Sequence, residues 1–573
     1  MPRLAAANGV QAMMLNRRMW LGGMAAVAAL PIPGGARARS VTAPGATPAF
    51  RATVDAIADF AAADLVAQGF PGMAVAVRAA DGQTATLALG DAILGRTPVR
   101  PDHLFQIGSI SKSLAAMAIY VLAAQGKLDL DAPAIGIVPE LWLDDRSITL
   151  TQLLAHTAGL PDDVPLFPDV PGGRLWSATP PGSHFSYSNA GYNMLAFVVE
   201  RLTGMRYDLA LTRLVLAPLG MTGAVAAIRT ADRARYAQGY VGFRGDSAWF
   251  PQSPLAEGPW TDIDFAAGSV AATSADMLRY IAFLGRLAQG KGAPLFPDAL
   301  ALRFATPLID TTDFGKGARY GAGLATVDID AAPAFHHTGG MLLFSSAVYV
   351  DRAIGAGVFA SVNIGGTGYR PRAVAAHGVR LLRALAAGTA PPPSPPFVAI
   401  APIAHADDFA GRFVGPGGDT IELAASGTAL TLVDSRHRGR IKAIGDGSFV
   451  SDLPGRSAHA IDFVAATGRR DRLWYGNTLY GRDIAPAQPP ADPALAMLAG
   501  DYASNDPWVG GTTILVRGDT LVAEGQGPLH RAADGSWRAA DPLSCERLWF
   551  DGIIAGRPHR LSLSGARVSR ITT

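Results

Sequence analysis

The chain has 573 residues, 49% hydrophobic and 17% charged, with 65 glycines and 41 prolines spread over its whole length. This composition excludes a disordered, collagen-like or coiled-coil protein, and the length predicts three or four domains. The single cysteine, Cys545, excludes an internal disulfide and a zinc site built from several thiolates. A formal net charge of +2, with no long basic run, argues against nucleic acid as a partner.

The first 38 residues have the pattern of an export signal. A twin arginine, Arg17-Arg18, precedes an apolar stretch, and small residues for a signal peptidase follow at Ala36-Arg37-Ala38. The apolar stretch is shorter than the roughly 20 residues that a bilayer-spanning helix needs. We therefore expect a Tat-like signal peptide at 1–38, a periplasmic or secreted protein, and no stable membrane insertion after signal removal. The alternative is an N-terminal helix retained on the domain.

Two proline-rich segments divide the remaining chain into three blocks. The segment 391–399 cannot continue a helix or a central strand, so it predicts a stiff linker, and 485–490 marks a second break. We expect a first domain at 45–390, one β module at 400–485 and a second β module at 494–573.

The first block mixes strand and helix patterns, which predicts a sheet with helices packed on it. Asp81-Gly82 separates the first two apolar runs and is a hairpin signal, and Gly126 suits a left-handed helix end. The predicted elements, in chain order, are strands Met73–Val77 and Thr84–Leu89, a helix from Ser109 to Gly126, and strands Leu342–Val350 and Gly357–Asn363.

The two C-terminal blocks are poor in helical periodicity and repeat each other. The repeated pairs are Phe409–Phe413 with Leu498–Tyr502, Asp446–Phe449 with Asp534–Trp537, and Arg472–Gly476 with Arg547–Gly552. They lie 89, 88 and 75 residues apart, which suggests the same order with one shorter loop in the second copy. We predict two related antiparallel β units, either small barrels or lipocalin-like sheets, that shape access to the first block. Sugar binding is a second hypothesis for them.

The strongest chemical signal is Ser109-Ile110-Ser111-Lys112. On a helix, positions i and i+3 share one face, so the Lys112 amine comes within reach of the Ser109 hydroxyl. A serine hydroxyl is a poor nucleophile until a base takes its proton, and a desolvated lysine can be that base. The chain uses only five lysines among 49 basic residues, and arginine cannot be deprotonated in proteins. Taken alone, the same spacing also fits a solvated helix start.

Two further motifs follow in order, Tyr187-Ser188-Asn189 and His337-Thr338-Gly339-Gly340. With them the chain resembles the penicillin-recognising serine hydrolases, which include class C β-lactamases, D-alanyl-D-alanine carboxypeptidases, family VIII esterases and D-aminopeptidases. The resemblance covers roughly residues 50–385 and implies an α+β fold of the β-lactamase/transpeptidase type, an antiparallel sheet flanked by helices. Segments that look like scaffold of that family are Ile148–Pro161, Pro218–Thr222 and Ala267–Ser269.

The resemblance implies an acyl-enzyme mechanism without a metal or another cofactor. Ser109 would form the ester intermediate, and Lys112 and Tyr187 would share the proton transfers, with the formal base left open between them. Asn189 would hydrogen-bond the substrate or hold Lys112.

The resemblance also implies how the substrate is held. The backbone N–H groups of Ser109 and Gly340 would form the oxyanion hole. The strand His337-Thr338-Gly339 would bind an extended substrate along its edge, and glycine suits a place where a backbone approaches a ligand closely.

Histidines mark the main departure from the family pattern. His337 stands where cell-wall carboxypeptidases and β-lactamases commonly carry lysine, and histidine is mostly neutral at pH 7. We therefore expect esters, amides or peptides recognised by other contacts than a terminal carboxylate. His156 is predicted to be a scaffold residue hydrogen-bonded in a turn. His336 and His337 face opposite sides of a strand, so one metal ion cannot easily use both.

These observations predict an exported serine hydrolase that acts on a small peptide or amide substrate. Tandem β modules after such a domain resemble the D-aminopeptidases, so peptides with D-residues and linearised non-ribosomal peptides are candidate substrates. The alternatives are a carboxylesterase or weak β-lactamase, and a sensor that binds peptidoglycan fragments or β-lactams without turnover.

Overall fold

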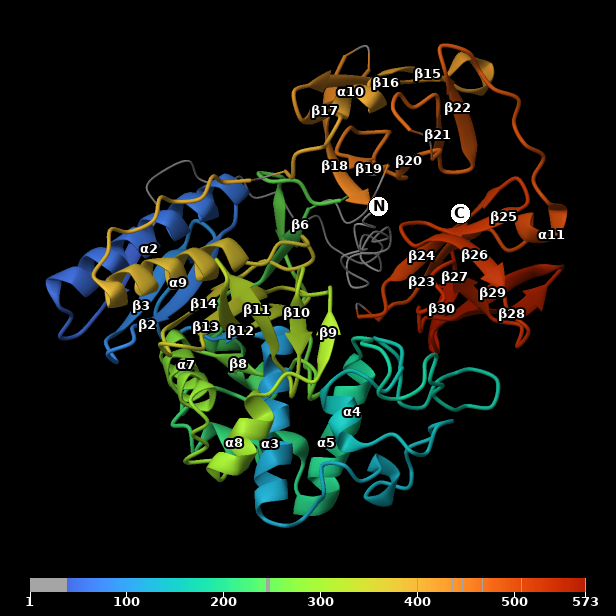
Figure 1. Cartoon of the computed structure of the whole chain (residues 1–573). Helices are drawn as coiled ribbons and strands as arrows, with labels where there is room; N and C mark the ends of the chain where they lie inside the picture. The colour runs from blue at the N-terminus through green and yellow to red at the C-terminus, as the bar shows by residue number, and fades with distance from the viewer. Residues whose placement is uncertain are drawn as a thin grey trace.

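The computed structural model describes residues 39–243, 248–398, 400–434, 436–445, 447–465, 467–506 and 508–571. The predicted signal peptide, 1–38, lies outside the described residues. A first domain of mixed sheet and helices, from β1 to α9, is followed by two closed β-barrels (Figure 1), as predicted. Within the described ranges, no helix has both the length and the hydropathy that a membrane crossing requires.

The first domain is built on a ten-stranded sheet in which every neighbouring pair is antiparallel. The strand order is β1-β3-β2-β14-β13-β12-β11-β10-β9, with β4 beside β3. The predicted hairpin β2–β3 therefore lies next to the predicted pair β13–β14 in the middle of the sheet. The strands are β1 (Arg39–Thr42), β2 (Gly72–Arg78), β3 (Thr84–Ile93), β4 (Thr97–Pro98), β9 (Ile309–Thr311), β10 (Ala318–Tyr320), β11 (Ala325–Ile329), β12 (Ala332–Gly340), β13 (Ser345–Asp351) and β14 (Gly357–Val362).

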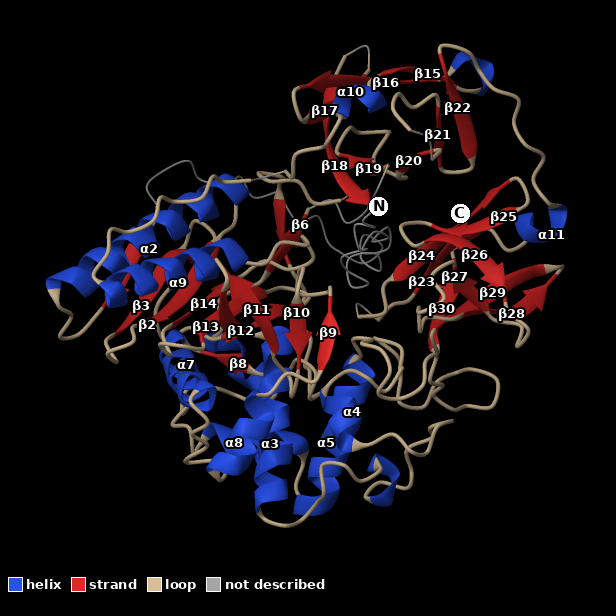
Figure 2. Cartoon of the chain, viewed as in Figure 1, coloured by secondary structure: helices blue, strands red, loops and turns tan. Residues whose placement is uncertain are grey.

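Helices cover both faces of this sheet (Figure 2). Helices α2 (Pro48–Gln68) and α9 (Arg372–Ala387) pack together on one face, and α7 (Ser274–Ala288) packs on the other. Every residue of β13 and β14 is buried as a result, and each strand contains a run of consecutive apolar residues rather than an alternating pattern. The other helices of this domain are α3 (Ser111–Ala124), α4 (Leu150–Leu154), α5 (Asn189–Thr203), α6 (Tyr207–Leu211) and α8 (Asp298–Ala305).

The predicted helix after Ser109 begins with one 3₁₀ turn, Gly108–Ile110, and continues as α3. Residues 111–122 of α3 are all buried, because α5, α6 and α8 surround it. Gly126 follows the helix with a φ of +69°, and Lys127 N–H donates to Leu122 O at 3.0 Å, which is the left-handed helix end that the glycine predicted. The helix that carries the Ser-x-x-Lys spacing is thus the centre of the helical layer.

The two barrels have eight antiparallel strands each, and in both the first strand pairs with the last. Barrel 1 consists of β15 (Gly411–Val414), β16 (Thr420–Ser426), β17 (Ala429–Val433), β18 (Arg438–Gly445), β19 (Ser448–Ser451), β20 (Ile461–Phe463), β21 (Arg472–Tyr475) and β22 (Thr478–Arg482). Barrel 2 consists of β23 (Gly500–Ala503), β24 (Gly511–Arg517), β25 (Thr520–Ala523), β26 (Gly527–Arg531), β27 (Trp537–Ala539), β28 (Leu548–Ile554), β29 (Arg557–Leu563) and β30 (Ala566–Arg570).

An arginine on the last strand closes each barrel in the same way. Arg482 lies over the Phe413 ring at 4.7 Å and donates to Ala410 O, and Arg570 lies over the Tyr502 ring at 5.5 Å and donates to Ala499 O. The glycine that begins the first strand of each barrel makes room for this guanidinium, since a Cβ at Gly411 would lie 1.9 Å from Arg482 Nη1. The first repeated pair is therefore a shared structural device.

The two members of the third repeated pair do not occupy equivalent strands of the two barrels. The prediction that they differ only by one shorter loop was therefore wrong. Arg472–Tyr475 forms β21, the seventh strand of barrel 1, whereas Leu548–Ile554 forms β28, the sixth strand of barrel 2. Both segments are amphipathic strand sequences with an inward leucine, Leu473 and Leu548, and similar strand patterning explains the likeness.

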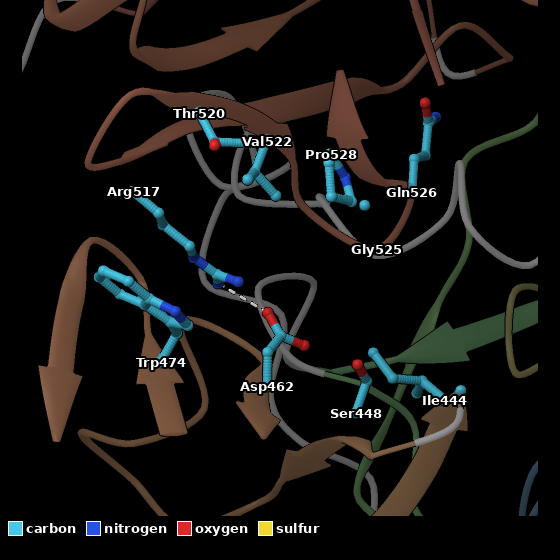
Figure 3. A pocket seen from close by; sticks show the side chains of 12 residues that line it. Ile444, Ser448, Asp462, Trp474, Arg517, Thr520, Val522, Gly525, Gln526 and Pro528 are labelled. Atoms are coloured by element: carbon cyan, nitrogen blue, oxygen red, sulfur yellow. Dashed lines mark hydrogen bonds and ion pairs between the residues drawn. The ribbon is translucent and has the colours of Figure 1, made fainter. Parts of the chain in front are cut away.

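A cavity of about 460 Å³ lies between the barrels (Figure 3). Arg517 of β24 reaches across it and pairs with Asp462 of β20 at 2.6 Å, with the Trp474 ring 5.5 Å from the guanidinium. His459 and Glu524 form a second contact between the barrels at 3.1 Å. The charged groups of this cavity neutralise each other, so it belongs to the interface that joins the two barrels.

Candidate active site

The structure brings Ser109 and Lys112 together at the start of α3. Lys112 Nζ lies 3.1 Å from Ser109 Oγ and donates to Ala267 O at 2.9 Å and to Asn189 Oδ1. Ser109 is partly exposed, whereas Lys112 is completely buried. A ligand can therefore reach the hydroxyl, while the amine acts on it from inside the protein.

Burial controls the protonation of Lys112. It lowers the pKa of this amine from 10.5 to about 7, although the nearby carboxyl groups of Asp162 and Asp163 act in the opposite direction. The rings of Tyr187 and Tyr192 lie 4.8 and 5.6 Å from Nζ and help to exclude water. A large fraction of the amine is therefore neutral near pH 7, with a lone pair available to the Ser109 hydroxyl.

Tyr187, in the segment just before α5, faces the hydroxyl of Ser109. Burial raises the pKa of its phenol well above 10, and a hydrogen bond with the Ser109 side chain lowers it by less. The phenol is therefore neutral at physiological pH and carries a proton that it can donate beside Ser109. The predicted residues Ser109, Lys112 and Tyr187 thus form one cluster.

Asn189 is placed by the N-terminus of α5. Ser188 is the N-cap, its Oγ accepting from Gly191 N–H at 3.1 Å and donating to Pro161 O at 2.7 Å. His156 Nδ1 accepts the Ser188 N–H at 3.0 Å, and its ring lies 4.3 Å from that of Tyr187. His156 is buried, with a pKa held well below 6.5 by burial, and it orients the Tyr187-Ser188-Asn189 turn.

Two adjacent carboxyl groups, which the sequence analysis did not select, hold the other end of Asn189. Asn189 Nδ2 donates to Asp162 Oδ1 at 3.0 Å and to Asp163 Oδ1 at 2.7 Å, while its Oδ1 accepts from Lys112. This fixes the amide orientation and makes the predicted role of Asn189 in holding Lys112 the one that the geometry favours. The only sequence signal was their position directly after the Ile148–Pro161 scaffold segment.

The end of β12 forms the wall opposite α3. Strand β11 pairs with β12 only as far as His336, so the following residues of β12 have no strand partner on that side among the residues that the structure describes. The backbone turn at Gly108 packs against them so closely that a Cβ on Gly108 would lie 2.7 Å from Gly340 N, and a Cβ on Gly339 1.9 Å from Ile107 O. The two predicted oxyanion-hole amides, of Ser109 and Gly340, therefore come from backbone segments in direct contact.

The imidazole of His337 points into the protein. It is buried, its Nδ1 donates to Thr338 O at 2.6 Å, and its Nε2 accepts from the Tyr320 hydroxyl at 3.1 Å. Burial lowers its pKa to about 3, so His337 is neutral and supplies no cation. Thr338, by contrast, is partly exposed. At position 337, therefore, a ligand can contact only the backbone and not the imidazole.

His336 faces the other side of β12, where its ring stacks on Tyr349 at 3.9 Å and its Nδ1 donates to Val348 O at 2.9 Å. In the described part of the chain, no three His, Cys, Asp or Glu side chains are grouped so that they could hold a metal ion.

Arg370 is a second residue that the sequence analysis missed. A Cβ on Gly340 would lie 2.1 Å from Arg370 Nη2, and the positive charge of Arg370 acts to lower the pKa of the Tyr187 phenol. Its guanidinium donates to Tyr369 O at 2.8 Å and to Ser345 Oγ at 3.3 Å. A cation therefore stands beside the end of β12 although position 337 is a neutral histidine. No local motif marked it, because the loop before α9 reaches the site only through the sheet topology.

Comparison with known proteins places this arrangement in context. A family model described as Beta-lactamase matches residues 50–380. Penicillin-binding protein 4 of Amycolatopsis lactamdurans is 29% identical over 300 residues, which cover 47% of this chain and 74% of that protein. Esterase EstB of Burkholderia gladioli is 37% identical over 161 residues, which cover 23% of this chain and 41% of the esterase.

A solved structure, the octameric penicillin-binding protein homologue from Pyrococcus abyssi, aligns over 74% of this chain and 99% of its own with a TM-score of 0.53. At 20% sequence identity, this likeness shows a shared fold and no more.

Proposed function

Because the chain belongs to the β-lactamase family of serine hydrolases, we propose that it hydrolyses an amide bond of a peptide through an ester formed on Ser109. The observation that carries this proposal is the 3.1 Å contact between Ser109 Oγ and the buried, partly neutral amine of Lys112. A nucleophile and a base within hydrogen-bond reach, the base oriented by further partners, are what acyl transfer requires.

In the acylation step, Lys112 takes the proton of Ser109 as Oγ attacks the substrate carbonyl. The N–H groups of Ser109 and Gly340 stabilise the negative oxygen of the tetrahedral intermediate. Asn189 and Ala267 O hold Lys112 in place throughout, because both accept hydrogen bonds from its Nζ.

The leaving group supports an amide as the substrate. An amine must take up a proton as the C–N bond breaks, and the neutral phenol of Tyr187 stands beside Ser109 with a proton to give. Acylation leaves Lys112 protonated and Tyr187 as a phenolate, so in the second half of the reaction the Tyr187 phenolate takes a proton from water as the water attacks the ester carbonyl. The bond to Ser109 Oγ then breaks, and Lys112 returns its proton to the serine, which restores all three groups.

The substrate is inferred to be a small peptide that lies along the open end of β12. Arg370 and the partly exposed Thr338 stand at this end, so a carbonyl or carboxylate next to the scissile bond finds a cation and a hydroxyl there. Peptides with D-residues and linearised non-ribosomal peptides remain the proposed classes.

A panel of D-amino acid anilides, short-chain nitrophenyl esters and nitrocefin tests this proposal. We expect hydrolysis of the anilides, mass spectra with a covalent adduct on Ser109 after a fluorophosphonate is added, and loss of both in Ser109→Ala. Nitrocefin as the best substrate by a wide margin would contradict the choice of peptide. A lasting adduct without turnover of any compound would identify a sensor instead.

A carboxylesterase is the second candidate, and the 37% identity to Esterase EstB over 161 residues favours it. Nitrophenyl esters hydrolysed at high kcat/KM together with inert anilides would select this function over the peptidase.

We also propose that residues 1–38 export the protein through the twin-arginine pathway. The paired arginines and the following short apolar stretch support this. Replacement of Arg17 and Arg18 by lysine is expected to leave the protein in the cytoplasmic fraction, and an unchanged distribution would contradict the proposal.

A further inference from the structure

Barrel 2 touches the loop that carries the carboxyl groups of the site. The contact is made by the docking segment, Ser544–Arg547, between β27 and β28. Trp176 Nε1 donates to Cys545 O at 2.8 Å, and Ser186 Oγ lies 3.0 Å from Cys545 Sγ. This segment therefore lies against the middle and the C-terminal end of the loop that leads from Pro161 to Tyr187.

Glu546 is the one acidic residue of the docking segment, and both of its carboxylate oxygens have donors. Asp162 N–H donates to Oε1 at 2.9 Å, and Ser564 Oγ, in the turn between β29 and β30, donates to Oε2. A side chain from barrel 2 thus fixes the backbone of Asp162, although 384 residues separate them in the chain.

A short series of hydrogen bonds links Glu546 to the proposed nucleophile. Asp162 Oδ1 accepts from Asn189 N–H at 3.2 Å and from Asn189 Nδ2 at 3.0 Å. Asn189 Oδ1 in turn accepts from Lys112 Nζ, which lies 3.1 Å from Ser109 Oγ. Each step as far as Lys112 has a single orientation, because a backbone N–H only donates and the Asn189 amide is held at both ends.

We propose that Glu546 is a positioning residue of the hydrolytic site, through which barrel 2 orients Asp162 and Asn189 against Lys112. This inference rests on the proposed function of Ser109 and Lys112. It gives barrel 2 a part in the chemistry itself, without contact between Glu546 and the substrate.

The charges around this link support an effect on reactivity. The carboxyl groups that face Glu546 are Asp162 and Asp163, and burial raises the pKa of all three. The charge of Glu546 raises the pKa of Asp162 further, and an ionised Asp162 would raise the pKa of Lys112. Besides these carboxyls, the titratable groups that face Lys112 are His156, His337, Tyr187 and Tyr192. Cys545 also faces Glu546.

Two variants of Glu546 separate geometry from charge. Glu546→Ala removes the acceptor of the Asp162 N–H, so Asn189 loses its fixed partner. Glu546→Gln keeps an oxygen acceptor at this place and removes the charge. Arg567→Ala is the matched control, since Arg567 Nε pairs with Asp169 at 2.8 Å on the same loop, at the exposed rim of the same interface.

The test measures the rate constant of Ser109 modification by a fluorophosphonate, and kcat and KM on the best substrate of the panel, as functions of pH. For Glu546→Ala we expect the modification rate and kcat to fall about 10- to 100-fold with a KM within about threefold, because a misplaced base slows the chemical step. For Glu546→Gln we expect a loss of less than about threefold and an acid limb moved to higher pH by about half a unit, because Asp162 then ionises more readily. Arg567→Ala is expected to stay within about twofold of the wild type.

Glu546→Ala with the rates and pH profile of Arg567→Ala would overturn the inference. If thermal unfolding shows that Glu546→Ala is not folded, the test is the pH profile of Glu546→Gln. An acid limb identical to that of the wild type would then overturn the inference. A wild-type protein that takes no adduct on Ser109 would overturn the proposed function together with it. If the fluorophosphonate modified Ser109 at the same rate in the wild type and in both Glu546 variants, only the role of Glu546 would be overturned.

Discussion

Barrel 1 and barrel 2 share their strand order and an arginine on the last strand that closes the barrel. They meet the first domain, however, through different contacts. Barrel 1 packs Val450 and Ala460 around Phe250, and Lys442 Nζ donates to Trp249 O at 2.8 Å. Barrel 2 instead places the docking segment beside Asp162 and Trp176. The same fold thus serves as an anchor away from the candidate active site in one copy and as a support beside that site in the other.

Two lysines make the comparison between the candidate site and the barrel 1 interface testable, since Lys112 is buried and Lys442 is partly buried. Lys112 lies in the site, and Lys442 lies where barrel 1 docks; burial lowers both pKa values, to about 7 and about 8. We expect Lys112→Met to lower kcat/KM about 10³-fold, as loss of a general base does. Lys442→Met is expected to keep kcat/KM within about twofold of the wild type. Equal losses in steady-state kinetics would contradict the assignment of Lys112, and not of Lys442, to the chemical step.

The aromatic anchors of the two interfaces provide the next test. Trp176 and Phe250 are both buried, so Trp176→Ala and Phe250→Ala should each lower the free energy of unfolding by about 3–5 kcal/mol, measured by denaturant titration. Only Trp176→Ala is expected to reduce kcat as well, by about tenfold, because it releases the docking segment. A kcat loss of the same size in Phe250→Ala would remove the distinction between the barrels.

The pH dependence gives the effect most specific to the base. Below pH 7 the amine of Lys112 becomes protonated, so kcat/KM should fall about tenfold per pH unit, and it should level off above pH 7. This acid limb should be the same in Lys442→Met.

Lys442 should affect stability rather than rate. Its pKa is lower in the folded protein than in the unfolded chain, so the unfolded chain binds more protons between about pH 8 and pH 10.4. Stability contributed by this residue therefore rises with pH across that window. The difference in unfolding free energy between wild type and Lys442→Met is expected to follow this rise, and a constant difference would contradict it.

Local patterns in the sequence were sufficient for much of the fold. The hairpin at Asp81-Gly82, the helix that ends before Gly126 and the two barrels all depend on signals within a few residues of each element. The contact between Ser109 and Lys112 was predictable for the same reason, since helix geometry alone places positions i and i+3 on one face.

The supporting groups were not predictable, because they depend on how distant segments pack. Asp162 reaches Asn189 only when two loops meet, Arg370 reaches Gly340 through the order of the strands, and Glu546 comes from another barrel. The prediction from the third repeated pair was wrong for a related reason. A strand sequence such as Arg472–Tyr475 shows which side chains face inward, but it does not show the position of the strand in the barrel.

Cys545 offers a direct way to follow the seam between barrel 2 and the first domain. It is the only cysteine of the chain, it is buried against Ser186, and burial raises the pKa of its thiol to about 11. Alkylating reagents attack thiolates, so this sulfur reacts only when the seam opens. The alkylation rate of the unmodified enzyme therefore measures how often barrel 2 separates from the first domain at Cys545, without any engineered label.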